Sequence, residues 1–221
     1  MAIRAVIFDI GGVLFQQADK SRQRRWEERL GLDENMLGRC IWTMPISHQA
    51  EIGQASEDDV WSAVAERFQL NPAQAAALRG DFFSGGQWND RLIGYAQTLR
   101  PRYKTGIISN AWPNARTSVR EHISEVGFDD LIFSAEVGLA KPDRCIYALA
   151  LERLQIQPAE AIFVDDVEGN VEGARAIGMT GLCFENTEHT IELIELYLEA
   201  SRLAHSRRNG RTSRTEEDKS C

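Results

Sequence analysis

Short apolar runs that end in polar residues recur along the chain, and each has the length of a buried strand. The first, AVIF, contains no polar position, as is typical of a strand that helices cover on both faces of a parallel sheet. Later runs of this kind alternate with segments in which apolar residues recur every three or four positions. The pattern predicts strands at 5–8, 105–109, 131–134, 161–164 and 181–184.

The segment between the third and fourth of these runs clearly shows the alternation of strand and helix patterns. Residues 142–154 have helical spacing, with Pro142 expected in the first turn. One predicted apolar face comprises Ile146, Tyr147, Ala150, Leu151 and Leu154. Strand and helix in alternation predict an α/β fold, a Rossmann-like doubly wound parallel sheet.

Residues 16–90 interrupt this alternation, because they contain helical patterns but no strand pattern. Ser56 with Asp59 is a capping pair, Asn71-Pro72 is a second helix start, and the Ser84-Gly85-Gly86 stretch is expected to be a flexible point. We therefore predict a core at 1–15 and 91–205, an all-helical cap at 16–90, and a disordered tail at 206–221, where apolar residues almost vanish.

Composition narrows the classes of function. The 221 residues carry a formal net charge of −8, which argues against a nucleic-acid partner. Four cysteines lie far apart without a CxxC pair, so neither a zinc site nor a disulfide framework is predicted. No run approaches membrane-spanning length and no signal-like segment opens the chain. The expectation is a cytoplasmic protein with no membrane partner; its oligomeric state is not indicated.

Polar side chains follow several of the predicted strands at the point where each strand ends. Ligands of open parallel sheets bind outside these carboxyl ends, so the side chains are expected to converge. They are Asp9, Ser109, Asn110, Asp165, Asp166 and Asn170, joined by Lys141 just before a predicted helix.

This set of residues suits phosphoryl transfer. Magnesium prefers oxygen ligands, and Asp9 with Asp166 can supply them, with Asp165 in support. A carboxylate can attack phosphorus to give an aspartyl phosphate, provided that nearby cations offset the charge of the phosphoryl oxygens. Lys141 would provide such charge. Ser109 and the Asn110 backbone would hold phosphate oxygens, and Asn170 would orient the carboxylates.

Four motifs in order, FDIGGVL, IISNAW, LAKPD and FVDDVEGN, resemble those of the haloacid dehalogenase superfamily over residues 3–184. The residues of these motifs are most similar to those of a phosphatase-like group that includes the amino-terminal domain of soluble epoxide hydrolases and bacterial glucose-1-phosphate phosphatases. The resemblance implies a helical cap that selects a small phosphorylated substrate, a magnesium cofactor, a metal contact from the Gly11 carbonyl and a phosphate contact at Gly12.

Gly11 departs from the family pattern, since phosphatases of this superfamily usually carry an aspartate there as general acid and base. Proton donation is worth about 100-fold to 10,000-fold in rate, so its absence should slow turnover or restrict the substrate. A non-catalytic module that binds phosphate and metal is therefore a competing hypothesis. Metal-independent dehalogenation ranks lower, because those enzymes carry serines where Asp165 and Asp166 stand.

Each of these residues also has a purely structural interpretation. Asp9 could end a strand, the Asp165-Asp166 pair could cap a helix, and Lys141 alone is typical of a solvated surface residue. Their joint occurrence, in the same order as the motifs of the superfamily, favours a functional role over a purely structural one. For Trp112, directly after IISNA, a pocket wall and simple packing stay open as alternatives.

Overall fold

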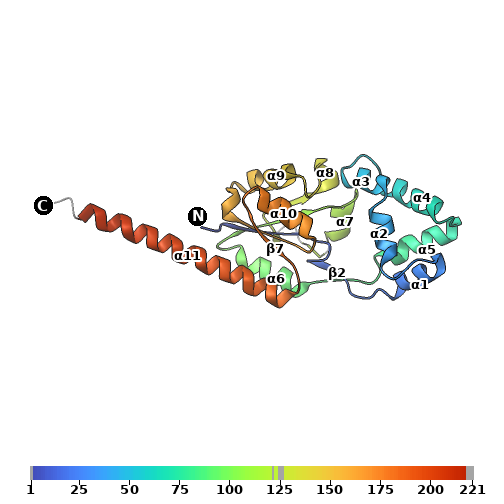
Figure 1. Cartoon of the computed structure of the whole chain (residues 1–221), viewed down its shortest axis with the longest axis horizontal. Helices are drawn as coiled ribbons and strands as arrows, with labels where there is room; N and C mark the ends of the chain where they lie inside the picture. The colour runs from blue at the N-terminus through green and yellow to red at the C-terminus, as the bar shows by residue number, and fades with distance from the viewer. Residues whose placement is uncertain (1, 121, 124–126, 218–221) are drawn as a thin grey trace.

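A computed structural model describes residues 2–120, 122–123 and 127–217, with side chains as far as Ala204. It has an α/β core and a group of helices at one end of that core (Figure 1). Five parallel strands form the core sheet in the order β5-β4-β1-β6-β7. They are β1 (Ala5–Phe8), β4 (Lys104–Ser109), β5 (Asp130–Phe133), β6 (Ala161–Asp165) and β7 (Thr180–Cys183). The predicted doubly wound fold is confirmed. Each strand end either matches its predicted position or differs from it by one residue.

Helices cover both faces of the sheet, and successive residues of β1 point to opposite sides. Val6 and Phe8 belong to one apolar cluster, together with residues of α6 (Asp90–Leu99) and α11 (Thr187–Glu217). Ala5 and Ile7 belong to the other, together with residues of α9 (Arg144–Leu154) and α10 (Glu168–Ala176). Burial on both faces explains why these strands read as continuous apolar runs. Short elements complete the core: α7 (Ala115–Val119), α8 (Ser134–Val137) and η2 (Pro158–Glu160).

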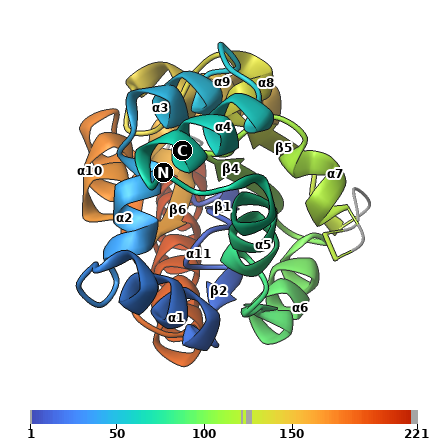
Figure 2. The ribbon, with the colours of Figure 1, turned by 90° about the vertical axis from the view of Figure 1, so that its right-hand side faces the viewer.

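The helices at the end of the core, here called the cap, have a small apolar core of their own. They are α1 (Ser21–Leu30), α2 (Met36–Trp42), α3 (Pro45–Glu51), α4 (Glu57–Arg67) and α5 (Pro72–Phe82). Ser56 and Asp59 form a reciprocal capping box at the start of α4, as the spacing predicted. Asn71 and Gln74 do the same for α5. Viewed from this end, the cap helices lie in front of the sheet (Figure 2).

The expectation that residues 16–90 lack strands is wrong at both ends of the segment. β2 (Phe15–Gln17) pairs with β3 (Gly86–Trp88) in an antiparallel ribbon where the chain leaves and re-enters the core. A Cβ at Gly86 would lie 1.8 Å from the Phe15 ring, so this glycine packs closely in the ribbon. With three residues in each strand, no alternating pattern is long enough to be recognised in the sequence.

The helix expected at 142–154 begins later than its pattern suggested. Pro142 precedes α9 and follows a cis peptide bond, and Asp143 is the N-cap, its side chain accepting a hydrogen bond from the Cys145 amide. The predicted apolar face of this helix is buried as expected. The shift places Lys141 in a loop beside the strand ends.

The carboxyl-terminal segment also differs from expectation, because α11 continues through residues 206–217, where composition predicted disorder. The helix is packed against the core at Ile194 and Leu198. Extending an existing helix adds one hydrogen bond for each residue that is fixed, whereas starting one is costly, so a polar segment can continue a packed helix. Residues 218–221 of the expected tail lie outside the described residues. Nowhere in the described part of the chain is there a helix with the length and apolar character needed to cross a bilayer.

Candidate active site

Three carboxylates meet at the carboxyl ends of β1 and β6. Phe8 pairs with Val164 in the register of these strands, so Asp9 and Asp165 follow at the same level. One oxygen from each of Asp9, Asp165 and Asp166 lies within 4.8 Å of the others. Asp9 and Asp165 are buried and Asp166 is exposed. The convergence expected from the strand ends is therefore present for these side chains.

Lys141 lies between two of the carboxylates. Its Nζ is 2.8 Å from Asp9 Oδ1 and 2.6 Å from Asp165 Oδ2, and its side chain is 1% exposed. Asp165 has little capacity left for a ligand, because its oxygens also accept hydrogen bonds from Asn170 Nδ2 at 3.0 and 3.1 Å and from the Val167 amide at 2.9 Å. Asp166 makes no comparable set of contacts among the described residues, which leaves its exposed oxygens open to a cation.

Asn110 holds the loop that carries the lysine. Its Nδ2 donates to the Lys141 carbonyl at 2.9 Å, and its Oδ1 accepts from the Lys141 amide at 2.8 Å. The side chain thus fixes Lys141, whereas the sequence suggested only a backbone role for Asn110. Ser109, at the end of β4, is buried, and its hydroxyl forms no hydrogen bond within the described residues. That hydroxyl is available to an incoming ligand.

The two glycines after Asp9 have different surroundings. Gly12 has φ of +78°, and a Cβ there would lie 2.0 Å from Asp166 Oδ2, so only glycine lets the loop approach this carboxylate. Gly11 is exposed, and a Cβ there would meet nothing within 4 Å. Gly12 therefore shapes the carboxylate site, whereas Gly11 leaves open space beside it.

Burial raises the pKa of Asp9 to about 7; Lys141 opposes the shift and the negative charge of Asp165 adds to it. The pKa of Asp166 is also raised, first by partial desolvation of this exposed carboxyl and then by the negative charge of Asp165. Crowded carboxylates with one ammonium disfavour their charged forms, and a bound cation would reverse this preference.

The donor set fits a magnesium ion. In ionised form the three carboxylates and Lys141 carry a net charge of two negatives, and carboxylate oxygens are the ligands that this hard cation prefers. The glycine that admits Asp166 to the loop agrees with a compact oxygen cradle. Asp9 and Asp166 are the residues that would hold the ion, with Asp165 fixed beside them.

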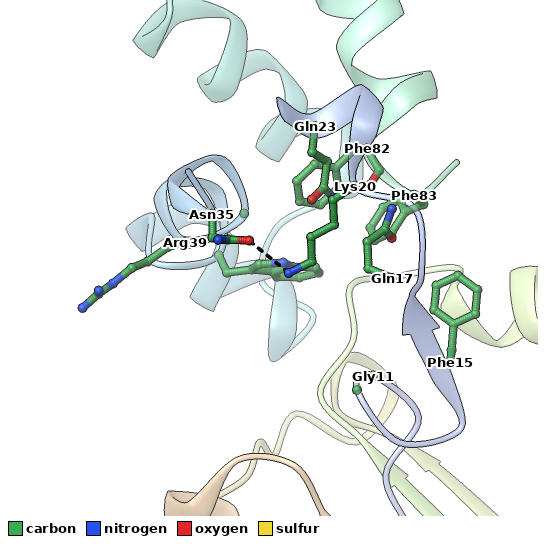
Figure 3. A pocket seen from close by; sticks show the side chains of 12 residues that line it. Gly11, Phe15, Gln17, Lys20, Gln23, Asn35, Arg39, Phe82 and Phe83 are labelled. Atoms are coloured by element: carbon green, nitrogen blue, oxygen red, sulfur yellow. Dashed lines mark hydrogen bonds between the residues drawn. The ribbon is translucent and has the colours of Figure 1, made fainter. Parts of the chain in front are cut away.

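A pocket of about 330 Å³ lies between the cap and the loop after β1 that contains Gly11 and Gly12 (Figure 3). Aromatic rings, amides and two cations from several elements surround this loop at Gly11. The lining residues are Gly11, Gly12, Phe15, Gln17, Lys20, Gln23, Asn35, Gly38, Arg39, Trp42, Phe82 and Phe83. No pattern in the sequence marked the cap members of this wall, because polar residues on a cap helix have the same character as any solvated surface.

Trp112 is a packing residue rather than a pocket wall. It is 5% exposed and lies in the apolar core of the cap, with its ring centroid 4.3 Å from that of Trp42. The loop before Trp112 is also held by a contact that the sequence did not predict: Ser134 Oγ accepts a hydrogen bond from the Ala111 amide at 2.9 Å. The loop after β4 thus joins the core to the cap.

Residues 3–178 match the model of a protein family described as haloacid dehalogenase-like hydrolase. The chain belongs to this family. The order of the four motifs had implied the same membership, and the carboxylates, Lys141 and the strand-end loops described above all lie within the matched range.

Two relatives are each 28% identical to this chain over the aligned segment. A bifunctional epoxide hydrolase 2 from Sus scrofa is 28% identical, over 88% of this chain and 39% of its own length. The chain therefore spans well under half of that relative. A sesquiterpene phosphatase from Aspergillus oryzae is 28% identical over 81% of this chain and 88% of its own length.

Solved structures confirm the fold. A predicted HAD-like family hydrolase from Porphyromonas gingivalis superposes with a TM-score of 0.71, covering 90% of this chain and 98% of that one at 23% identity. An aspartate-to-alanine mutant of a HAD family enzyme from Bacteroides thetaiotaomicron, in complex with magnesium and inorganic phosphate, gives a TM-score of 0.69 at 21% identity, covering 86% of this chain and 99% of that one.

Proposed function

We propose that this hydrolase is a magnesium-dependent phosphatase that acts on a small phosphomonoester, such as a sugar phosphate, through an aspartyl-phosphate intermediate. One observation carries the proposal: Asp9 Oδ1 lies 2.8 Å from Lys141 Nζ, in a cluster with two further carboxylates. The names of several relatives support it, since they are phosphatases. The magnesium and phosphate complex of the Bacteroides enzyme supports the choice of cofactor.

In this proposal Asp9 and Asp166 hold the metal, together with the Gly11 carbonyl, while Asp165 supports them through its fixed position. Magnesium bound there supplies positive charge beside the phosphoryl oxygens. Asp165 has a second task, because its contact with Lys141 at 2.6 Å holds the ammonium next to Asp9. Asn170 keeps Asp165 in place through hydrogen bonds to both of its oxygens.

Asp9 attacks phosphorus through a carboxylate oxygen, and the bond between phosphorus and the leaving oxygen breaks, with its electron pair departing on that oxygen. Water then attacks phosphorus and cleaves the bond to Asp9, which releases phosphate and restores the carboxylate. Lys141 offsets charge on the phosphoryl group, and the free Ser109 hydroxyl can donate to one of its oxygens. The backbone of Asn110 and Gly12 completes the phosphate contacts in this scheme.

Phosphate release from a panel of sugar phosphates and an aryl phosphate, with magnesium and with EDTA, tests the proposal. Wild type should turn over at least one substrate only with magnesium, and Asp9→Asn should abolish that turnover. Asp58→Asn is a matched control, because it makes the same chemical change on a carboxylate that is 82% exposed on α4 of the cap. The control should retain wild-type activity.

Other outcomes would contradict the proposal. Phosphate binding by a chain that is inert across the panel, with wild type and Asp9→Asn alike, would favour a non-catalytic module. Release of chloride from 2-haloacids in EDTA would favour dehalogenation.

A further inference from the structure

The space beside the proposed nucleophile contains no side chain at position 11. Gly11 lies in the pocket wall, is exposed, and would accept a Cβ with no atom within 4 Å. Its φ lies outside the left-handed region, so its backbone does not require glycine. The loop could therefore hold a larger side chain here without strain, and the departing part of a substrate has room in its place.

The rest of the pocket wall does not replace the missing acid. Among the described residues that line it there is no carboxylic acid, imidazole, thiol or phenol; the ionisable members are Lys20 and Arg39. Lys20 Nζ donates to Asn35 Oδ1 at 3.0 Å, toward the cap, and Arg39 points away from the other labelled side chains (Figure 3). Asp165 is saturated by hydrogen bonds, and Asp166 belongs to the proposed metal site.

Without a proton donor, the leaving oxygen must take the electron pair of the broken bond and depart as an anion, which solvent then protonates. The cost of that step follows the acidity of the leaving hydroxyl. A phenol has a pKa of about 10 and a carboxylic acid about 4, so both can leave unassisted. A hydroxyl whose acidity approaches that of water, with a pKa of about 16, cannot leave readily as an anion.

The geometry points to a substrate whose phosphoryl group is attached to an acidic leaving oxygen, such as that of a phenol, an enol or a carboxylic acid. This inference rests on the proposed function and narrows its substrate class: sugar phosphates that are alkyl esters would release a weakly acidic hydroxyl and should be poor substrates. The aromatic side chains of Phe15, Trp42, Phe82 and Phe83 in the same pocket provide apolar surface for a flat leaving group of this kind.

The test compares kcat/KM across phosphate monoesters of graded leaving-group pKa, from nitrophenols through phenol to alkyl alcohols, in the full chain with magnesium. The ratio kcat/KM reports the first phosphoryl transfer even where hydrolysis of the intermediate limits kcat. Wild type should lose activity steadily as the leaving-group pKa rises.

Gly11→Asp supplies the missing acid and should raise kcat/KM for the alkyl phosphates by about 100-fold to 10,000-fold, with little gain for nitrophenyl phosphate. Gly11→Asn is the matched control, because it has the same size but no proton of comparable acidity, and it should show no such gain.

Two results would overturn the inference. One is a wild-type kcat/KM that stays within about tenfold from nitrophenyl to alkyl phosphates, a difference of only about 1.4 kcal/mol in barrier. The other is an equal gain from Gly11→Asn and Gly11→Asp. If Gly11→Asp does not fold, the wild-type series alone decides. If Asp9→Asn abolishes hydrolysis but the wild-type kcat/KM does not depend on leaving-group pKa, this inference is refuted and the phosphatase proposal stands. No hydrolysis of any member would refute both.

Discussion

Replacing Lys141 by methionine removes the ammonium that lies between two buried carboxylates. Its Nζ is 2.8 Å from Asp9 and 2.6 Å from Asp165, and the lysine side chain is 1% exposed. At an effective dielectric constant of about 20, each contact corresponds to about 6 kcal/mol of attraction before the cost of desolvation. Leaving buried charge without its partner costs about 3–5 kcal/mol net, so Lys141→Met should lower the free energy of unfolding by that amount.

Guanidinium unfolding at neutral pH in EDTA measures this loss, with Arg79→Met as the matched control. Arg79 also bridges two carboxylates, Asp58 at 2.6 Å and Glu57 at 3.0 Å, but its side chain is 42% exposed. Solvent screens such pairs, so the control should cost less than about 1 kcal/mol. Equal losses in the two variants would refute the reasoning, because they would show that burial of the Lys141 contacts has no energetic consequence.

Two further predictions concern the carboxylates. Gly12→Ala should lose most of its magnesium affinity in a calorimetric titration, because its Cβ would lie 2.0 Å from Asp166, whereas Gly11→Ala, with nothing within 4 Å, should bind as wild type does. In EDTA, the pKa of Asp9, raised from 3.8 to about 7, favours the folded state below pH 3.8, and this advantage is lost as pH rises through about 7. The unfolding free energy of wild type relative to Asp9→Asn should therefore fall over that range; a flat difference would contradict the assignment.

The convergence of the polar residues at the strand ends could be predicted from the sequence, because a parallel sheet brings the carboxyl ends of its strands to one edge. Asp9 follows β1 and Asp165 closes β6, and their convergence needs only the adjacency of these two strands. Because β1 lies between β4 and β6 in the sheet, the residue that follows it, Asp9, is close to the ends of both neighbouring strands.

Other features depend on contacts that no local pattern records. The Asn110 side chain fixes Lys141 through two hydrogen bonds across 31 residues of chain. The pocket wall combines Gln17, Lys20 and Asn35, whose polar character is also that of an ordinary solvated surface. Packing of separate segments, rather than propensity, determines where these side chains lie.

A crystal structure of the chain grown with Mn²⁺ and phosphate, with the metal located by anomalous scattering, tests the central claim most directly. Mn²⁺ accepts the same carboxylate and water ligands as magnesium. We expect one ion in contact with both Asp9 and Asp166, and phosphate beside Lys141. An ion that binds Asp166 but not Asp9, or a phosphate bound away from this edge of the sheet, would contradict the account.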